Sequence, residues 1–259
     1  MAPALIDTHC HLDAVEFDGD RDAVVARALA CGVGRIIVPA ISAANFAAVQ
    51  ATCAQYTLCR PALGLHPIYA MQHRDADLAQ LRAAVIANRP VAIGEIGLDL
   101  FIRDIDVVVQ THFFVEQLKI AREFDLPVLL HTRHANDEII KQLRRYNIRR
   151  GIAHAFNGSM QQAEAFIKQG IKLGFGGAFT YPRASNLRRL VVALPLEAIM
   201  LETDAPDMAP AWAHRQRNSP EYLAQIAAEL AALRGIDIST LIQTSAQSAD
   251  VVFGAASLS

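Results

Sequence analysis

Short apolar runs alternate along the chain with longer segments in which apolar residues recur every three or four positions. Two of the longer segments contain the sets Met160, Ala163, Phe166 and Ile167, and Tyr222, Ile226, Leu230 and Leu233. Residues three and four apart stack on one face of a helix, so each set predicts an amphipathic helix. The apolar runs predict eight strands, at residues 5–11, 35–40, 58–66, 91–97, 127–132, 151–156, 172–177 and 198–204.

Strands that alternate with helices imply parallel strands joined by right-handed crossovers. Eight such units in 259 residues predict an α/β fold of the (β/α)8 TIM-barrel type. A doubly wound open sheet is the competing architecture. No Ser/Gly/Pro-rich linker or change of composition divides the chain, so we expect a single domain over residues 1–259. The helical stretch 238–253 exceeds the eight repeats, and we expect it to pack outside them.

Polar residues typical of metal sites follow the predicted strands. They are His9, His11, His66, Glu95, His131, His154 and Asp204. The carboxyl ends of all strands in a parallel barrel open on one face, and six strands deliver these side chains to that face. An open sheet would spread the same positions along a line. The convergence therefore favours the barrel.

Composition narrows the class of protein. A chain that is 53% hydrophobic and 19% charged is neither disordered nor a small disulfide-stapled module. The formal net charge of −2 argues against binding of nucleic acid through a broad basic face. It does not argue against a nucleic-acid enzyme whose positive charge is concentrated at a metal site. The four cysteines contain no CxxC pair, which predicts reduced thiols in a cytoplasmic protein.

Two segments bear on membrane association. Residues 1–10 lack a basic region and include Asp7, so we expect no secretory signal. The stretch between Arg35 and Arg60 has no charged residue, but Pro39 and Asn45 interrupt it, which predicts a buried strand followed by a packed helix. We therefore expect a cytoplasmic protein without membrane contact, and the sequence is compatible with a monomer.

The motif Asp7-Thr8-His9-Cys10-His11 ends the first predicted strand. Side chains at i and i+2 of a strand point to the same side, so both imidazoles can hold one ion; two ordinary polar histidines are the alternative. Glu95 stands between Gly94 and Gly97 at the end of the fourth strand. A carboxylate between glycines can approach metals closely and bridge two ions, with a helix cap or salt bridge as the alternative.

His131 and His154 each end an apolar run, where a lone histidine is more often a hydrogen-bonded core residue. Two of them on neighbouring strands favour ligation, because each would otherwise be a buried titratable group in need of a partner. Asp204 ends the eighth strand, which neighbours the first strand when a barrel closes. These residues, with Glu95 and the histidines of the first strand, make up four histidines and two carboxylates. That set is the ligand complement of a two-metal hydrolytic centre.

Four motifs resemble the TatD-related metal-dependent hydrolases, also called TatD deoxyribonucleases. They are Asp7-Thr8-His9-Cys10-His11, Gly64-Leu65-His66-Pro67, Gly94-Glu95-Ile96-Gly97-Leu98-Asp99 and Glu202-Thr203-Asp204-Ala205-Pro206. The runs 97–101, 180–185 and 204–208 are similar to the YjjV-type branch. The resemblance spans nearly the whole chain and implies a TIM barrel of the amidohydrolase-like superfamily.

By this resemblance, the chain would bind two divalent metal ions, with Zn, Mn, Mg and Co as the candidates. His9, His11 and Asp204 would hold the first ion, His131 and His154 would hold the second, and Glu95 would bridge them. The implied activity is hydrolysis of nucleic-acid phosphodiesters, typically from the 3′ end of DNA. Asn157 and Thr132 stand where serine is common in the family, and neither is an expected ligand.

Glu95 and Asp204 are the predicted catalytic residues. Asp204 is placed to act as a general base if it contacts both an ion and a bound water, with a pure ligand role as the alternative. Arg133 can fork onto a phosphate or can be an ordinary surface guanidinium. His66 can donate to the substrate or orient a ligand, and Asp99 is expected to support a ligand or to form a loop salt bridge.

Further basic residues lie in two places. Arg183, Arg188 and Arg189 follow the seventh strand and are candidates for contact with a phosphate backbone. The basic run 141–150 precedes the sixth strand and therefore falls at the opposite end of the barrel, where we interpret it as a solvated helix terminus.

Three functions are compatible with these residues. The leading one is a metal-dependent deoxyribonuclease that acts on DNA, at single strands or 3′ ends. The rival enzyme is an amidohydrolase or esterase, such as a D-aminoacyl-tRNA deacylase; since small-molecule amidohydrolases often bridge their metals with a carboxylated lysine, Glu95 favours the nuclease. The third is a non-catalytic binding barrel, which the convergent ligand-type residues argue against because unpaired charges in a cleft are costly.

Overall fold

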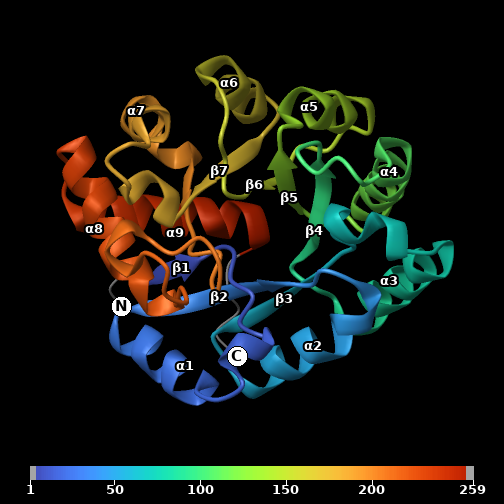
Figure 1. Ribbon diagram of the computed structural model, residues 1–259, viewed down its shortest axis with the longest axis horizontal. Coiled ribbons are helices and arrows are strands. Elements are labelled where there is room, and N and C mark those ends of the chain that lie inside the picture. Colours follow the sequence, from blue (N-terminus) through green and yellow to red (C-terminus); the bar gives the residue numbers. More distant parts are fainter. Residues whose placement is uncertain (1–3, 255–259) are drawn as a thin grey trace.

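The computed structural model describes residues 4–254, and they form a barrel of parallel strands surrounded by helices (Figure 1). The strands lie in the order of the sequence, from β1 to β8. They are β1 (Leu5–Asp7), β2 (Val33–Pro39), β3 (Cys59–Leu63), β4 (Ala92–Asp99), β5 (Val128–Arg133), β6 (Gly151–Ala153), β7 (Ile171–Phe175) and β8 (Ile199–Leu201). The predicted (β/α)8 barrel is confirmed, and each predicted strand overlaps an observed one.

The barrel closes between its first and last strands. The backbone N–H of Thr8 donates to the carbonyl of Leu201 at 3.0 Å, and that of Asp204 donates to the carbonyl of His9 at 2.8 Å. An open, doubly wound sheet would leave these edges apart, so that alternative is wrong. The Asp7 carboxylate reinforces the closure, because it accepts hydrogen bonds from the backbone and hydroxyl of Thr203.

Two apolar cores follow from the pleat of the strands. The inner core contains one residue from most strands together with residues of the last helix: Ile6, Ile37, Ala62, Ala92, Leu129, Ile152, Met200, Ala249 and Val252. Their strand neighbours, such as Ile36 and Val38, pack outward against the helices. Leu129 and Ile152 precede His131 and His154 by two residues, so alternation sends both histidines to the inside of the barrel.

The helices that cover the barrel are α1 (Arg21–Ala30), α2 (Phe46–Gln55), α3 (Asp75–Asn88), α4 (Val107–Glu123), α5 (Asn136–Arg145), α6 (Met160–Lys168), α7 (Ser185–Ala193), α8 (Leu223–Arg234) and α9 (Ile238–Phe253). Local chemistry sets their ends. Ser159 and Gln162 form a capping box at the start of α6, and Gly235 ends α8 in the left-handed region. Ala163 and Phe166 of the predicted apolar face of α6 are buried.

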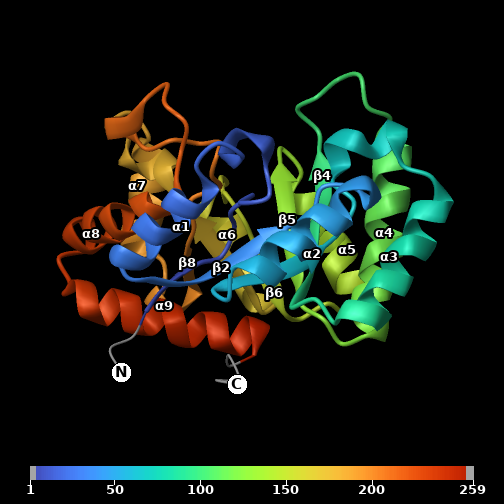
Figure 2. The same cartoon turned by 90° about the horizontal axis from the view of Figure 1, so that it is seen from below.

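Helix α9 lies across the end of the barrel opposite the long loops (Figure 2). It contacts β1 and β8, and its Ala249 and Val252 join the inner core. Arg35 of β2 pairs with Asp250 at 2.6 Å. The helix is indeed outside the eight repeats, and it closes the amino-terminal end of the barrel rather than adding to the outer ring.

Six of the eight strands end earlier than the sequence predicts, and the early ends of β1, β6 and β8 shape the site. Strand β6 stops at Ala153 and β8 at Leu201, and the backbone then turns through positive φ at Ala155 (43°) and Asp204 (58°). Strand β1 stops at Asp7. The histidines and the aspartate that follow these strands therefore sit in connecting segments, where they are free of the regular ladder and can turn into the mouth of the barrel.

Two expectations from composition can be compared with the fold. The uncharged stretch between Arg35 and Arg60 forms β2 and α2, as predicted, and no helix among residues 4–254 is long and apolar enough to cross a bilayer. All four cysteines are free.

Candidate metal centre

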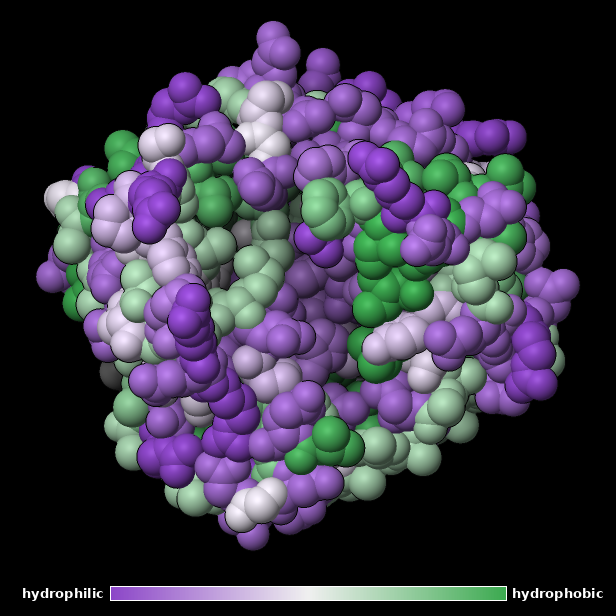
Figure 3. All heavy atoms as spheres, in the orientation of Figure 1, coloured by the Kyte–Doolittle hydropathy of each residue, from purple (hydrophilic) through white to green (hydrophobic). Residues whose placement is uncertain are grey.

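A deep cavity opens at the carboxyl ends of the strands. Its volume is about 1410 Å³, and all six predicted ligands except the buried His9 are among its lining residues. Figure 3 shows the cavity as a hollow with hydrophilic residues at its bottom, bordered by hydrophobic residues on the side where β4 and α4 lie. The site thus occupies the face on which barrel enzymes carry their chemistry.

Glu95 occupies the centre of the cavity floor. It lies within β4, which runs on to Asp99, and not at the end of the strand as the sequence suggested. A bulge surrounds it, because Ile93 pairs with Val128 while Ile96 pairs with Leu130. Gly94 is required here: a Cβ at this position would lie 2.5 Å from the Cβ of Leu129. The Glu95 side chain is only 2% exposed.

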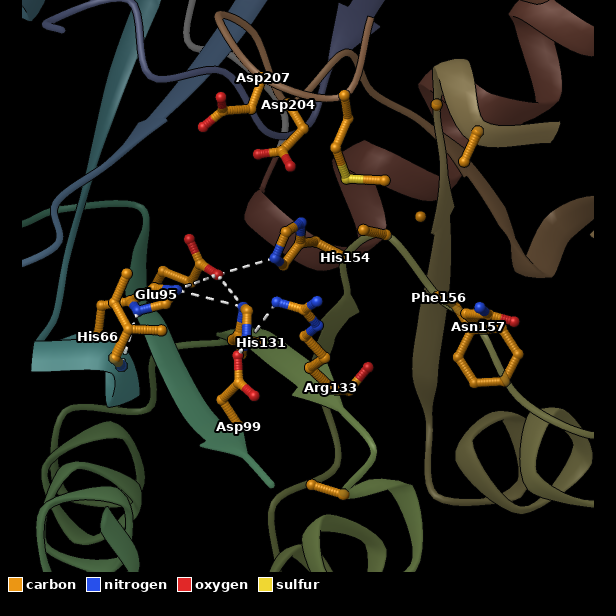
Figure 4. A pocket seen from close by; sticks show the side chains of 18 of the residues that line it. His66, Glu95, Asp99, His131, Arg133, His154, Phe156, Asn157, Asp204 and Asp207 are labelled. Atoms are coloured by element: carbon orange, nitrogen blue, oxygen red, sulfur yellow. Dashed lines mark hydrogen bonds and ion pairs between the residues drawn. The ribbon is translucent and has the colours of Figure 1, made fainter. Parts of the chain in front are cut away.

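The two oxygens of Glu95 face different histidines. Oε2 lies 3.0 Å from Nε2 of His9 and 3.5 Å from Nε2 of His11. Oε1 lies 2.9 Å from Nδ1 of His131 and 2.8 Å from Nε2 of His154. Figure 4 shows the side chains of Glu95, His131 and His154 turned toward one another. The carboxylate therefore divides four histidines into two pairs, with one oxygen for each pair.

The hydrogen bonds of the outer ring nitrogens fix two of the tautomers. Nδ1 of His11 lies 3.2 Å from the carbonyl of Pro39, which can only accept, so Nδ1 carries the hydrogen. Likewise Nε2 of His131 lies 3.1 Å from the Asp99 carboxylate. When neutral, both rings turn a lone pair toward Glu95. Lone pairs that face a carboxylate repel it unless a proton or a metal cation lies between them.

His66 has the opposite tautomer. Its Nδ1 accepts a hydrogen bond from the backbone N–H of Ile68 at 3.1 Å, so Nε2 carries the hydrogen. That Nε2 lies 2.9 Å from Oε1 of Glu95 and 3.2 Å from Nδ1 of His131. His66, Glu95 and His131 are close enough to share an ion. If His66 bound an ion through Nε2, however, its hydrogen would have to lie on Nδ1, where it would face the backbone N–H of Ile68. The ring is thus built as a hydrogen-bond donor.

Asp204 lies between the two histidine pairs. Its Oδ1 is 3.6 Å from Nε2 of His9 and 3.8 Å from Nε2 of His11. Ligand atoms of His9, His154 and Asp204 also lie within 4.8 Å of one another. Burial raises the pKa of Asp204, although His154 and His11 oppose that effect. Its side chain remains 13% exposed, so it reaches both the ligand cluster and the open cavity.

The electrostatics of the centre favour bound positive charge. Burial would raise the pKa of Glu95, but the surrounding imidazoles, His66 and His154 first, hold it well below its usual value. Burial would lower the pKa values of His11 and His154, yet the Glu95 carboxylate outweighs it and raises them to about 9 and about 10. For His9, burial and the neighbouring His154 outweigh the effect of the Glu95 carboxylate and lower its pKa well below 6.5.

This donor set fits divalent cations. Imidazole nitrogen with carboxylate oxygen suits Zn²⁺, Mn²⁺, Co²⁺ and related ions. The six residues converge from β4, β5 and the segments after β1, β6 and β8, and the carboxylate at their centre is nearly inaccessible to solvent. Without a cation, His11 and His154 must retain protons to balance the carboxylate, as their raised pKa values indicate.

The other predicted site residues lie in different surroundings. Asp99 is buried against His131, so it supports that ring. Arg133 is half exposed, 3.9 Å from Asp99, and its guanidinium carbon lies 4.1 Å above the ring of Phe101. The three arginines 183, 188 and 189 do not line the cavity. Helix α5 begins at the cavity and ends with the basic run on the far side, as expected.

Sequence reasoning assigned no role to Glu202. Its Oε1 accepts a hydrogen bond from the backbone N–H of Ala155 at 2.5 Å and lies 4.0 Å from Nδ1 of His154. Gly174 makes room for it, because a Cβ there would lie 2.0 Å from Oε2 of Glu202. Burial raises the pKa of Glu202 to about 8. The carboxyl group thus holds the turn from which His154 projects, and its place in the 202–206 motif was the available signal.

Known proteins resemble this chain over nearly its full length. Residues 6–254 match the family model described as TatD related DNase. The chain is 48% identical over 238 residues to the metal-dependent hydrolase YjjV of Escherichia coli (strain K12), covering 90% of this chain and 92% of that protein. It is 34% identical over 257 residues to the 3'-5' ssDNA/RNA exonuclease TatD of Cronobacter sakazakii, covering 96% and 97%. The crystal structure of YJJV from E. coli K12 superposes with a TM-score of 0.95 at 44% identity, covering 98% of this chain and 100% of that one.

Proposed function

This chain belongs to the TatD-related family of metal-dependent hydrolases, and from that premise we propose that it is a deoxyribonuclease that removes nucleotides from the 3′ end of single-stranded DNA. The names of relatives at 34% and 32% identity, 3'-5' ssDNA/RNA exonuclease TatD, support this substrate. The cavity volume, about 1410 Å³, exceeds the 300–1,000 Å³ that is usual for small-molecule sites, and this also favours a larger substrate.

One observation carries the proposal: each oxygen of the Glu95 carboxylate faces its own pair of histidines. His9, His11 and Asp204 would hold one divalent cation, His131 and His154 would hold a second, and Glu95 would contact both. A pair of cations held in this way lowers the pKa of a bound water and neutralises charge that develops on phosphate oxygens.

The protein's own groups supply the proton transfers and the positioning. A carboxylate oxygen of Asp204 accepts a proton from the attacking water, a role that its burial-raised pKa and its place between the histidine pairs favour. His66 lines the cavity, and its Nε2–H lies 2.9 Å from Oε1 of Glu95; in the reaction it would donate to an oxygen of the scissile phosphate instead. Asp99 keeps the His131 ring oriented, as carboxylates behind ligating histidines do.

The reaction balances with water alone. The oxygen of water bonds to phosphorus, one of its protons passes to Asp204, and the bond from phosphorus to the leaving sugar oxygen breaks. The leaving oxygen takes up a proton, which Asp204 can return. The products are a phosphomonoester and a free hydroxyl, so no further reactant is needed.

A labelled-substrate assay tests this proposal. The purified protein, supplied with Mn²⁺, Zn²⁺, Co²⁺ or Mg²⁺, is given 5′-labelled single-stranded DNA beside a panel of esters, amides and D-aminoacyl-tRNA. We expect stepwise shortening from the 3′ end that a chelator abolishes. Exclusive hydrolysis of acyl substrates would overturn the nuclease proposal.

Two variants refine the role of Asp204. Asp204→Asn is expected to abolish turnover while weakening substrate binding much less, since the amide cannot accept the proton. Equal losses in binding and rate would reduce Asp204 to a ligand. Asp137→Asn is the matched control, because Asp137 lines the same cavity and contacts Gln162 rather than the histidines.

A further inference from the structure

The charge of the cavity wall poses a problem for a polyanionic substrate. Eight carboxylate side chains line the cavity, among them Asp13, Asp99 and Asp207, whereas Arg133 is the one Lys or Arg among the lining residues. Every nucleotide brings a negative phosphate, and nucleic-acid-binding surfaces normally meet it with Lys and Arg. Contacts beyond the scissile phosphate must therefore come from another part of the nucleotide.

Arg133 offers a flat surface instead of a simple charge. Its guanidinium carbon lies 4.1 Å from the centroid of the Phe101 ring, which is cation–π distance. Arg133 lines the cavity and Phe101 does not, so the ring supports the guanidinium from behind. Phe101 is 53% exposed and also contacts the ring of His134, with centroids 5.2 Å apart. We call this pair the Arg133–Phe101 platform.

The platform is tied to the metal centre through one carboxylate. Oδ1 of Asp99 accepts hydrogen bonds from the backbone N–H groups of Phe101 and Ile102, at 3.0 and 3.3 Å. Oδ2 of the same group lies 3.1 Å from Nε2 of His131 and 3.9 Å from Arg133. Asp99 is buried, with 1% of its side chain exposed. Asp99 thus fixes the loop that carries Phe101 beside His131, a predicted ligand on the same strand, β5, as Arg133.

We propose that the Arg133–Phe101 platform is a stacking subsite for the nucleobase next to the scissile phosphate. This inference rests on the proposed function and deepens it by naming how the substrate is recognised. Planar guanidinium groups and aromatic rings stack on the face of any base, so the subsite tolerates every base. The edge of the guanidinium remains available to a phosphate oxygen, while its face takes the base.

Calorimetric titration of two ligands tests the subsite. Thymidine 5′-monophosphate and 2-deoxyribose 5-phosphate carry the same phosphate and sugar, and only the first has a base. Both are titrated into Mn²⁺-loaded protein. We expect the nucleotide to bind about 5- to 150-fold more tightly, the range that stacking of one base supplies. Abasic and normal 3′ ends of single-stranded DNA should show the same ratio in kcat/KM.

Two substitutions locate the preference. Arg133→Lys keeps the charge and removes the planar group, and Phe101→Ala removes the ring behind it. Both should bring the ratio of the two affinities toward one, because binding of the nucleotide weakens far more than binding of 2-deoxyribose 5-phosphate. Both side chains are about half exposed, so folding should persist. Arg145→Lys is the matched control, because Arg145 lies 5.6 Å from the ring of Tyr146 at the far end of α5.

The outcomes separate this subsite from the nuclease activity. The stacking proposal is overturned if the unsubstituted protein binds both ligands equally, or if its preference for the nucleotide persists in Arg133→Lys. Equal weakening of both ligands by Arg133→Lys also overturns it and leaves Arg133 as a phosphate contact only. A protein that prefers the nucleotide but cleaves no DNA retains the subsite and loses the proposed function. A protein that cleaves DNA but shows no preference for the nucleotide supports the proposed function and contradicts the stacking subsite.

Discussion

Replacement of His66 distinguishes a donor from a metal ligand. His66 stands close enough to Glu95 and His131 to share an ion, yet the N–H of Ile68 occupies its Nδ1 and leaves a hydrogen on Nε2. If the ring acts as a donor, His66→Ala should leave the metal content unchanged and slow the reaction. If it acts as a ligand, the same change should remove metal.

The expected size of the effect follows from these contacts. A hydrogen bond to a charged group contributes about 1.5–3 kcal/mol, which corresponds to roughly 10- to 150-fold in kcat/KM. His66 also caps the 3₁₀ helix η3 (Pro67–Gln72) through the N–H of Ile68, and loss of a cap costs about 1 kcal/mol of stability. The variant should therefore fold, with a slightly lower midpoint of thermal unfolding.

Three measurements on the variants decide the matter: elemental analysis of bound metal, kcat and KM on single-stranded DNA, and thermal unfolding. His66→Gln should recover part of the rate, because its amide N–H can reach the position of Nε2. His112→Ala serves as control, since His112 is an exposed partner of Asp75 away from the cavity. Loss of one metal equivalent in both His66 variants would refute the donor assignment.

Three further predictions follow from the geometry. Glu95→Gln offers one ligating oxygen instead of two, so bound metal should fall by at least one equivalent in elemental analysis; unchanged content would contradict the bridge. Burial would lower the pKa values of His11 and His154, but the Glu95 carboxylate raises them to about 9 and about 10, so a cation must displace protons from both rings. Metal affinity should therefore decrease as the pH is lowered, by up to about tenfold per pH unit for each displaced proton. Titration calorimetry in two buffers would reveal the released protons, and their absence would refute the linkage. Gly174→Ala would clash with the Glu202 side chain and should cost about 1–3 kcal/mol, lowering the melting temperature by several degrees, whereas Gly19→Ala meets open space and should not.

Much of the fold could be predicted from the sequence because its signals are local. Strand runs and helical periodicity repeat eight times, and short connections between parallel strands leave few topologies. The ends of the strands were less predictable. Ala155 and Asp204 adopt positive φ although neither is glycine, and only tertiary contacts, such as the Glu202 bond to the N–H of Ala155, hold them there. Propensity carries no signal for such positions.

The site divides in a similar way. The types and strand positions of the ligand-type residues were readable, since the carboxyl ends of barrel strands meet. The sequence could not predict that each Glu95 oxygen faces its own pair of histidines, because this depends on the rotation of the rings. It could not predict the tautomer of His66 either, because that depends on the backbone N–H of Ile68. Phe101 belongs to the run 97–101 that carries part of the family resemblance, but it was assigned no role. An exposed apolar residue in the loop after a strand was the available signal for a contact at the mouth of the barrel.

The charge distribution of the cavity reconciles an acidic wall with the proposed nucleic-acid substrate. The chain concentrates carboxylates around its mouth and leaves its one lining guanidinium stacked on Phe101, so the polypeptide itself attracts a phosphate backbone weakly. Cations between Glu95 and the histidine pairs would reverse the sign of the field at a single point, the cavity floor. One phosphate is then attracted and its neighbours are repelled by the wall. A strand end can satisfy both conditions, because it places one phosphate deep in the cavity and one base on the platform, whereas the middle of a strand brings phosphates to the acidic rim on both sides.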